Sequence, residues 1–369
     1  MQNLAPRPGV LDISPYIGGE SVIPGVTRII KLASNEGALG PSPQAVAASH
    51  GDADGLCRYP DGACSNLREA IGAHHGLDPT RITCGGGSDE LISILARAYV
   101  GAGDELLYSQ YGFLMYAIAA TGLGAKPVTA PEKSLTADVD ALLAKVTDRT
   151  RAVFLANPNN PTGTYLAFDE VRRLHAGLPG NVLLVLDAAY AEYMTADDYR
   201  AGVELVDSAE NVVMTRTFSK IYALGGLRLG WCYGPTAVID VVNRLRGPFN
   251  VTTPAQMAGL AALADQAHVD KVRSHTLRWR DWTTEALRGQ GLDVPDSVGN
   301  FILARFASPA EADGADAFLR KNGVIVRKMG GYGLAESLRI TIGTEEEMRL
   351  LAELLGDYQR TRLAQAVSI

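Results

Sequence analysis

The residues of this sequence that could do chemistry follow short apolar runs. Asn160 lies in a turn between two prolines, and Asp187 ends an apolar run with Tyr190 one turn onward. Lys220 follows Ser219 after a third apolar run. A buried carboxylate without a partner is costly, so Asp187 should face a cation. Together these residues predict a site for a charged ligand, although a single lysine is more often a solvated surface group.

A fourth apolar run leads into a glycine turn, Gly85-Gly-Gly-Ser88-Asp89-Glu90. The free backbone amides and the helix dipole at such a helix start can hold a phosphate group. The turn is not Gly-x-Gly-x-x-Gly and lacks the Lys-Ser/Thr of nucleotide-binding loops, so a plain helix cap stays open as the alternative. The backbone amides of Ser88 and Asp89 are therefore candidates for binding a phosphate.

The elements that must position these residues are short apolar runs that alternate with helical patterns. Runs that are apolar on both faces predict buried parallel strands covered by helices. In such sheets ligands bind at the carboxyl ends of the strands, where the candidate residues stand. The predicted fold class is α/β, with a large doubly wound, mainly parallel sheet domain and a smaller α+β domain. The predicted central strands are 105–108, 152–156, 182–186 and 211–215.

The pattern changes after the last of these strands. Thr253 and Pro254 predict the N-cap and first residue of a long amphipathic helix that continues toward Gly289. Thr344 and Glu347 predict a capping box for a closing helix. Between these helices, strands are predicted at 301–304, 324–326 and 338–342. The predicted organisation is an N-terminal arm with part of the small domain at 1–50, a large domain at 51–252, and a linking helix with a small C-terminal domain at 253–369.

Composition excludes several classes of protein. The 369 residues, 47% hydrophobic and 20% charged, can bury a large core. A net charge of −7 provides no cationic field for nucleic acid or an anionic membrane. Without a basic start followed by an apolar run, or a stretch that could span a bilayer, we expect a cytoplasmic protein. The cysteines form no Cys-x-x-Cys pair, so neither a disulfide framework nor a metal site is expected: Cys57, Cys64, Cys84 and Cys232.

As a set, these motifs resemble the fold-type I pyridoxal-phosphate aminotransferases, and in detail the histidinol-phosphate aminotransferase branch. Their order and spacing fit, with Lys220 eight residues before Arg228. The resemblance covers nearly the whole chain through Leu32–Glu36, Leu39–Pro43, Arg58–Pro60 and Arg339–Gly343. The chain departs from the usual pattern after Asn35-Glu36-Gly37, where Ala38 stands in place of a proline.

The resemblance implies pyridoxal 5'-phosphate as the cofactor, bound by the large domain. Lys220 would bond the cofactor aldehyde and then act as general base and acid. Asp187 would pair with the pyridine nitrogen, so that the ring can accept electrons. Asn160 and Tyr190 would hydrogen-bond the phenolic oxygen, and Phe113 would stack on the ring, with core packing as its alternative. The phosphate would be held by the amides of Ser88 and Asp89, the hydroxyls of Thr217 and Ser219, and the guanidinium of Arg228.

The resemblance also implies a substrate site and an assembly. Arg339 would clamp the substrate carboxylate, or the phosphate of histidinol phosphate, because a planar fork suits either anion. Tyr16, Asn35 and Arg327 match substrate-site positions of this branch. Tyr59 would reach the cofactor phosphate of the neighbouring subunit, which implies a homodimer with shared active sites. The alternative is that Tyr59 is a packing aromatic beside a turn.

The implied function is the transamination of histidinol phosphate with 2-oxoglutarate, giving imidazole acetol phosphate and glutamate, in histidine biosynthesis. An aminotransferase for phenylalanine or tyrosine stays open, because the N-terminal arm at 11–19 occurs in both kinds of enzyme. Decarboxylation of threonine phosphate is a third reaction on the same branch. A non-catalytic regulator would need an appended DNA-binding module, for which the roughly thirty residues before Lys31 are too few.

Overall fold

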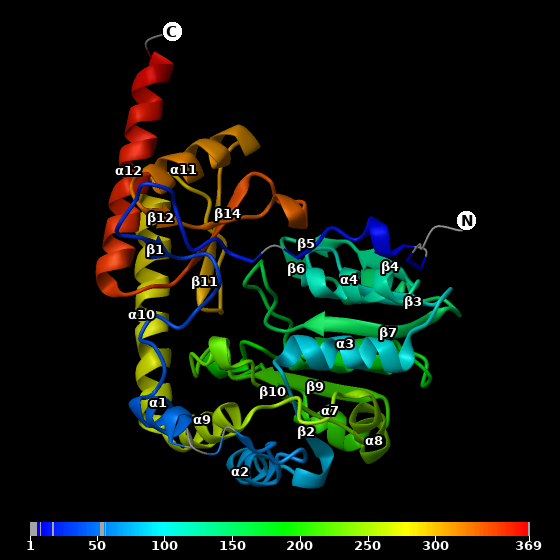
Figure 1. Cartoon of the computed structure of the whole chain (residues 1–369). Helices are drawn as coiled ribbons and strands as arrows, with labels where there is room; N and C mark the ends of the chain where they lie inside the picture. Colours follow the sequence, from blue (N-terminus) through cyan, green and yellow to red (C-terminus); the bar gives the residue numbers. More distant parts are fainter. Residues whose placement is uncertain (1–5, 8, 17, 52–54, 56, 368–369) are drawn as a thin grey trace, which may run out of the picture.

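The computed structural model describes residues 6–7, 9–16, 18–51, 55 and 57–367 (Figure 1). The outer ends of the predicted N- and C-terminal parts, at 1–5 and 368–369, lie outside the described residues, as do 52–54 near the start of the predicted large domain.

The central sheet has seven strands in the order β2-β10-β9-β8-β7-β3-β4. The strands from β9 to β4 in this order run parallel, whereas β10 is antiparallel to both of its neighbours. The four predicted central strands are confirmed as β3, β7, β8 and β9. The strands are β2 (Ile82–Gly85), β3 (Glu105–Ser109), β4 (Lys126–Ala130), β7 (Thr150–Ala156), β8 (Leu183–Asp187), β9 (Val212–Thr217) and β10 (Gly230–Tyr233).

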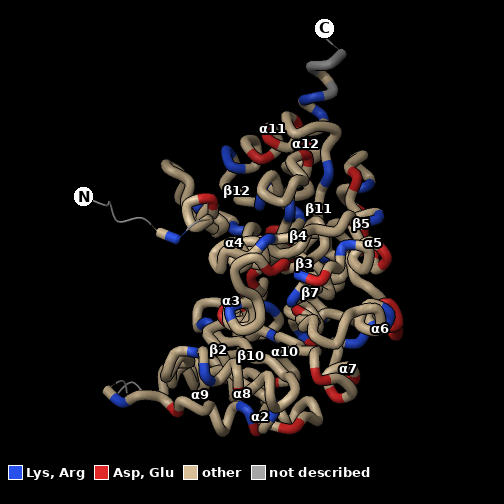
Figure 2. The backbone as a smooth tube through the Cα atoms, turned by 90° about the vertical axis from the view of Figure 1, so that its right-hand side faces the viewer, with Lys and Arg blue, Asp and Glu red and all other residues tan. Residues whose placement is uncertain are grey.

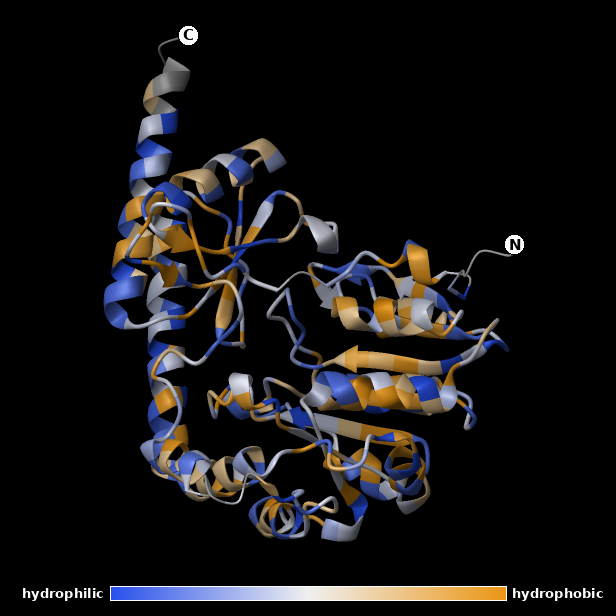
Figure 3. Cartoon of the chain, viewed as in Figure 1, coloured by the Kyte–Doolittle hydropathy of each residue, from blue (hydrophilic) through white to orange (hydrophobic). Residues whose placement is uncertain are grey.

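Helices cover both faces of this sheet because its strands are apolar on both sides. In β7, Val153 and Leu155 pack into one hydrophobic cluster, and Ala152 and Phe154 pack into another on the opposite face. The strand carries the hydrophobic colour toward its arrowhead in Figure 3. The first cluster includes α2 (Ser65–His75), α5 (Val139–Leu143), α6 (Phe168–Gly177) and α7 (Val203–Ser208), and the second includes α3 (Ser88–Tyr99), α4 (Leu114–Gly122) and α8 (Thr236–Leu245). The predicted α/β fold class is confirmed.

A separate hydrophobic core, with two smaller sheets, lies beside the large sheet. There β14 pairs antiparallel with β11 and β13, and β1 pairs parallel with β12. The predicted strand at 324–326 is shorter than expected, because the chain passes from β12 into β13 of a different sheet. The strands are β1 (Ile30–Lys31), β11 (Phe301–Arg305), β12 (Val324–Ile325), β13 (Arg327–Lys328) and β14 (Ser337–Thr341), packed on α10 (Gln266–Gly289), α11 (Pro309–Lys321) and α12 (Glu345–Val367). The boundaries of the predicted domains stay predictions.

The linking helix differs from its prediction in two details. Thr252, not Thr253, caps α9 (Thr253–Ala264), since its hydroxyl accepts from the Ala255 N–H at 3.3 Å. Asp265 then separates α9 from α10 and caps α10 by accepting from the His268 N–H at 3.2 Å. The apolar pattern continues across Asp265, so the sequence predicted one helix where the structure has two.

The remaining elements connect these layers. The predicted capping box of α12 is confirmed, because the Thr344 N–H donates to the Glu347 carboxylate at 2.7 Å and the Glu347 N–H to the Thr344 hydroxyl at 3.4 Å. The short elements are α1 (Pro43–His50), β5 (Glu132–Lys133), β6 (Thr136–Ala137) and the 3-10 turns η1 (Val10–Asp12), η3 (Pro79–Arg81), η4 (Ala191–Tyr193), η5 (Gly225–Leu227) and η6 (Gly330–Tyr332).

The surface chemistry of the described part agrees with the composition. Basic and acidic residues are intermixed along the backbone drawn in Figure 2. Among the described residues, no helix is long and apolar enough to cross a bilayer. The same part of the chain contains no group of three or more His, Cys, Asp or Glu side chains that could hold a metal ion.

Candidate active site

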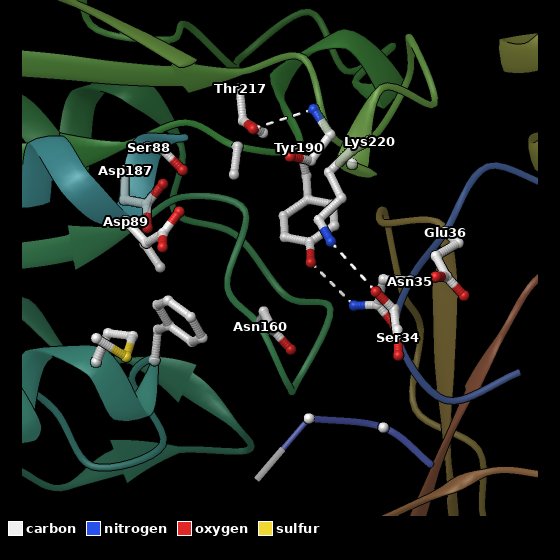
Figure 4. Close-up of a pocket in the computed structure, with 18 of the residues that line it drawn as sticks. Ser34, Asn35, Glu36, Ser88, Asp89, Asn160, Asp187, Tyr190, Thr217 and Lys220 are labelled. Carbon is white, nitrogen blue, oxygen red and sulfur yellow. Dashed lines mark hydrogen bonds between the residues drawn. The ribbon is translucent and has the colours of Figure 1, made fainter. Parts of the chain in front are cut away.

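One cavity of about 360 Å³ gathers the predicted site residues. It opens at the carboxyl ends of β7, β8 and β9, and β13, β14 and the segment 33–36 line it from the other side. Figure 4 shows Asn35, Asn160 and Lys220, from three distant segments, pointing into the same space. Every predicted site residue except Tyr59 lines this cavity: Tyr16, Asn35, Ser88, Asp89, Phe113, Asn160, Asp187, Tyr190, Thr217, Ser219, Lys220, Arg228, Arg327 and Arg339.

The N-terminus of α3 forms one end of the cavity. Gly87 precedes it with φ of +100°, and a Cβ there would lie 2.3 Å from the Arg228 guanidinium. A Cβ on Gly230 would lie 2.4 Å from the Ser88 amide nitrogen. Arg228 in turn pairs with the Asp89 carboxylate at 2.5 Å. The backbone therefore packs tightly around the first amides of α3, which leaves a helix N-terminus and a guanidinium beside each other, as an anion requires.

Asp187 is a buried carboxylate at the end of β8, with 6% of its surface exposed. It accepts hydrogen bonds from the Tyr116 hydroxyl at 2.7 Å and from the Thr215 hydroxyl at 3.5 Å. Burial raises the pKa of Asp187, and the hydrogen bonds from Tyr116, the Ala189 N–H and Thr215 partly oppose that shift. Because these donors are all neutral, the ionised carboxylate still lacks a cationic partner, and a protonated ring nitrogen would supply one.

Lys220 brings an amine to the centre of the cavity. Its Nζ donates to the Ser34 carbonyl oxygen at 3.3 Å and lies 5.8 Å from the centre of the Tyr190 ring (Figure 4). Burial, with a further contribution from the positive charge of Arg339, lowers the pKa of Lys220 to about 8. An amine with this pKa is uncharged in a useful fraction near neutral pH, so it can act as a nucleophile and as a base. The residue before it, Ser219, lines the same cavity with Thr217.

Two polar side chains flank the amine. The Tyr190 hydroxyl is buried and accepts a hydrogen bond from the Asn35 side-chain amide at 2.9 Å. Burial raises the pKa of Tyr190, so its hydroxyl stays protonated and can donate. The Asn160 side-chain oxygen accepts from the Arg339 guanidinium. Since asparagine donates through its NH₂ group, this bond is compatible with the predicted contact to a phenolic oxygen.

Arg339 and Arg327 place two guanidinium groups on neighbouring strands. They face each other in the register of β13 and β14. Arg339 is 6% exposed and donates to the Ala33 carbonyl oxygen at 2.9 Å, and burial lowers its pKa. Its Nε is buried and has no hydrogen-bond partner among the described residues. A buried guanidinium with an unsatisfied donor is suited to a ligand carboxylate or phosphate.

Aromatic side chains also line the cavity. Phe113 precedes α4 and contacts Tyr16 edge-on, with ring centres 6.2 Å apart, and Tyr116 with ring centres 5.9 Å apart. The Arg327 guanidinium lies 5.9 Å from the centre of the Tyr16 ring. Phe113 therefore both lines the cavity and packs against the core, so neither of its two interpretations excludes the other.

Sequence reasoning missed three residues that shape the site. Tyr116, which bonds to the carboxylate of β8, lies one helical turn after Phe113 and carried no signal of its own. Asn300 donates to the Asn35 carbonyl oxygen at 3.0 Å, and the Thr341 hydroxyl donates to the Asn35 side-chain oxygen at 3.2 Å. Thr341 stands two residues beyond Arg339, so strand periodicity could have placed it on the same face.

Tyr59 lies outside this cavity. It is 81% exposed and stacks on Phe249, with ring centres 4.6 Å apart and an angle of 16° between the rings. The two rings line a second cavity of about 550 Å³. An exposed aromatic pair is a feature that subunit interfaces cover, and the contact of Tyr59 with a neighbouring subunit stays a prediction.

The donors of the main cavity fit pyridoxal phosphate. The amides of α3 with Arg228 match a phosphate, Asp187 matches a pyridine nitrogen, and Lys220 matches an aldehyde. These groups line one continuous cavity, and the absence of side chains at 87 and 230 allows Arg228 and the Ser88 amide to approach closely.

Comparisons with known proteins agree with this chemistry. The profile of the family "Aminotransferase class I and II" matches residues 27–355. A histidinol-phosphate aminotransferase of Paramagnetospirillum magneticum is 60% identical over 96% of this chain and 98% of its own length. One of Rhodospirillum rubrum is 58% identical over 96% of both chains.

The same branch is found among solved structures. The histidinol-phosphate aminotransferase of Sinorhizobium meliloti in complex with pyridoxal-5'-phosphate superposes with a TM-score of 0.91 at 28% identity, over 97% of this chain and 99% of that one. An aromatic aminotransferase of Pyrococcus horikoshii shares the fold, with a TM-score of 0.81 at 24% identity over 91% of this chain and 97% of that one. This chain therefore belongs to the class I and II aminotransferases, enzymes whose cofactor is pyridoxal phosphate, and within them to the histidinol-phosphate aminotransferase branch.

Proposed function

We propose that the protein transfers the amino group of histidinol phosphate to 2-oxoglutarate, giving imidazole acetol phosphate and glutamate in histidine biosynthesis. The observation that carries the proposal is the pair of guanidinium groups, Arg327 and Arg339, in the same cavity as Lys220 and Asp187. Arg327 and Arg339 offer anion contacts from β13 and β14, and the N-terminus of α3 with Arg228 offers a further anion site in the same cavity. Relatives at 52–60% identity that carry the name histidinol-phosphate aminotransferase support this substrate.

Different residues of the chain have different roles in transamination. When bound, pyridoxal phosphate supplies an aldehyde that takes up an amine and a ring that accepts electrons. Lys220, with its pKa of about 8, takes a proton from the substrate carbon and returns it to another atom. Asp187 would provide a negative charge for the ring nitrogen, and Tyr190, whose burial keeps its hydroxyl protonated, would donate a hydrogen bond to the phenolic oxygen. The rings of Phe113 and Tyr16 contact each other and line the same cavity beside these groups.

Both substrates use the same anion site in turn. Arg339 makes a bidentate contact with the carboxylate of glutamate or with the phosphate of histidinol phosphate, because its planar fork fits either group. Arg327 then binds the second carboxylate of glutamate or 2-oxoglutarate, each of which carries two. This alternation requires a ping-pong mechanism, in which the first product leaves before the second substrate enters.

A second candidate is an aminotransferase for phenylalanine or tyrosine. The observation in its favour is the aromatic wall of Tyr16 and Phe113, whose rings would pack on a benzene ring as well as on an imidazole. The two candidates differ in a panel of donors with 2-oxoglutarate. We expect kcat/KM to be highest for histidinol phosphate, and a higher value for phenylalanine or tyrosine would reverse the assignment. Release of CO₂ from threonine phosphate would indicate the decarboxylase instead.

We further propose that the protein acts as a homodimer with shared active sites in the cytoplasm. The exposed pair of Tyr59 and Phe249 beside the second cavity supports an interface at this face. Sedimentation of the cofactor-loaded protein tests the dimer. A monomer with full activity would contradict it, because the predicted role of Tyr59 needs two chains.

A further inference from the structure

The segment 33–37 sets how far Lys220 lies from the anion site. Its backbone accepts hydrogen bonds from both sides. The Ser34 carbonyl oxygen accepts from the Lys220 amine at 3.3 Å (Figure 4), and the Ala33 carbonyl oxygen accepts from Arg339 at 2.9 Å. A shift of this segment therefore moves the substrate side of the cavity relative to the reacting amine.

The segment is anchored on the side of β11 and β14. The Asn300 side-chain amide donates to the carbonyl oxygens of Asn35 at 3.0 Å and Glu36 at 3.3 Å, and the Asn35 N–H donates to the Thr341 hydroxyl at 2.9 Å. Because the segment is held on this side, the distance between segment 33–37 and the loop after Lys220 depends on the contact between those two parts of the chain.

That contact is made by Gly37 and Ala223. A Cβ on Gly37 would lie 2.7 Å from the Ala223 Cβ, but 3.4 Å from the Ala223 Cα and 3.4 Å from the Lys220 carbonyl oxygen. Gly37 is not among the glycines with positive φ, so its backbone conformation does not itself require glycine. Of these three contacts, only the methyl group of Ala223 is too close to allow a side chain at position 37.

Ala223 stands where glycine would be the easier residue. Its φ is +55°, in the left-handed region that a side chain disfavours, and its N–H donates to the Lys220 carbonyl oxygen at 3.0 Å. The turn after Lys220 thus holds a methyl group in an unfavourable backbone conformation, directed at the one residue of segment 33–37 that has no side chain.

We propose that Gly37 and Ala223 are a matched pair of positioning residues that sets the distance between Lys220 and the substrate-binding segment. The inference rests on the proposed transamination. Neither residue touches a reacting atom, and both act through the backbone positions of Lys220 and Ser34.

The test is a cycle of Gly37→Ala, Ala223→Gly and the double variant. Carbon atoms in contact stay roughly 3.5–4 Å apart, so the methyl added in Gly37→Ala displaces the segment by about 1 Å. A misplacement of that size can lower a rate by about 100-fold. We expect Gly37→Ala to lower kcat/KM for histidinol phosphate and for 2-oxoglutarate by about 10- to 100-fold. The double variant lacks the close methyl contact and should return to within about 3-fold of the value for Ala223→Gly alone.

A spectroscopic measurement separates positioning from general damage. The visible absorbance of the cofactor-loaded protein should titrate with a shifted midpoint in Gly37→Ala, because the Ser34 carbonyl no longer lies near the Lys220 nitrogen, and should return in the double variant. Gly226→Ala is the matched control, since Gly226 lies in η5, three residues after Ala223, with no atom within 4 Å of its added Cβ. It should keep the native titration and the native kcat/KM.

Three results would overturn the pairing. These are native kinetics and titration in Gly37→Ala, a double variant as impaired as Gly37→Ala, or an equal loss in Gly226→Ala. If Gly37→Ala does not fold, the double variant decides alone, because a folded and active double variant supports the pair and an unfolded one refutes it. A wild-type protein that does not transaminate would refute the proposed function, while the absorbance titration would still test the pair.

Discussion

Replacement of Asp187 by asparagine should stabilise the cofactor-free protein and impair the loaded enzyme. In the folded state the pKa of Asp187 is raised above its unfolded value by burial. The folded protein therefore prefers the protonated acid, and the ionised form costs stability at every pH above the folded pKa. As the pH falls toward the unfolded pKa near 4, both states become protonated and the cost disappears. Asp187→Asn should remove this cost at pH 7 to 8, and the gain should fade in acid.

The magnitude follows from the contacts of the carboxylate. Burial of an ionised carboxylate costs several kcal/mol. The charge strengthens the hydrogen bond from Tyr116 at 2.7 Å, which returns about 1–2 kcal/mol, whereas the bond from Thr215 at 3.5 Å is weak. The net gain for the asparagine variant is on the order of 1 kcal/mol, or about 1–2 °C for a chain of this length. In the loaded enzyme, the lost charge should lower kcat by about 100-fold, equal to about 3 kcal/mol of transition-state stabilisation.

Asp316→Asn is the matched control. Asp316 is also 6% exposed, but it lies on α11 and pairs with Arg320 at 2.8 Å. Its replacement should lower stability, by about 1 kcal/mol, and leave kcat unchanged. The assays are urea unfolding of cofactor-free protein across pH 4 to 8 and steady-state kinetics at saturating cofactor. A less stable cofactor-free Asp187→Asn protein, or a loaded one with native kcat, would refute the reasoning.

Three further predictions concern the rest of the site. Uptake of pyridoxal phosphate by the cofactor-free protein should speed up as the pH rises through about 8. The reason is that about 10% of Lys220 is uncharged at pH 7, against about 0.03% of an ordinary lysine. An uptake midpoint near pH 10, or a borohydride-trapped adduct that survives Lys220→Ala, would contradict this. Arg339→Lys should lower kcat/KM for glutamate and histidinol phosphate together by about 10- to 100-fold, since an ammonium makes no bidentate contact, and a loss for one substrate alone would assign the other to Arg327. Mixing Tyr59→Phe with Lys220→Ala subunits should restore native cofactor affinity at one site of the heterodimer if Tyr59 acts across the interface, and should restore nothing if it acts within its own chain.

The residues that sequence reasoning placed correctly share one physical property. Asp187 ends a strand of the parallel sheet, Asn160 and Lys220 come shortly after two others, and the carboxyl ends of parallel neighbours meet at one edge. A correct assignment of the strands was therefore enough to bring these side chains together. The glycine turn before Ser88 was readable for the same reason, because it follows β2 and opens a helix.

The residues that were missed depend on contacts between distant segments. Asn300 holds Asn35 across 265 positions in the sequence, and no local pattern relates the two. The noted departure from the family pattern was Ala38, whereas Gly37 before it was not singled out, and its contact with Ala223 is visible only in the structure. The break at Asp265 was also hidden, because the amphipathic pattern continues across it while the residue caps the next helix. Periodicity places a side chain on a face but does not identify its distant partner.

The charges of the cavity indicate what its ligands contribute to the fold. Burial shifts the pKa of Lys220 down, that of Arg339 down and that of Asp187 up, so all three charged forms are disfavoured in the cofactor-free protein. Each shift is of the sign that a bound group of opposite charge would reverse, namely a ring cation at Asp187 and a substrate anion at Arg339. A site that only stabilised the fold would pair these groups with each other, yet the hydrogen-bond partners of Asp187 are neutral and the Nε of Arg339 is unsatisfied. Any ligand that binds only the folded state raises the free energy of unfolding. Cofactor and substrate should raise it by more than ligands of an uncharged cavity of this size would, because they also complete ion pairs that the chain leaves open.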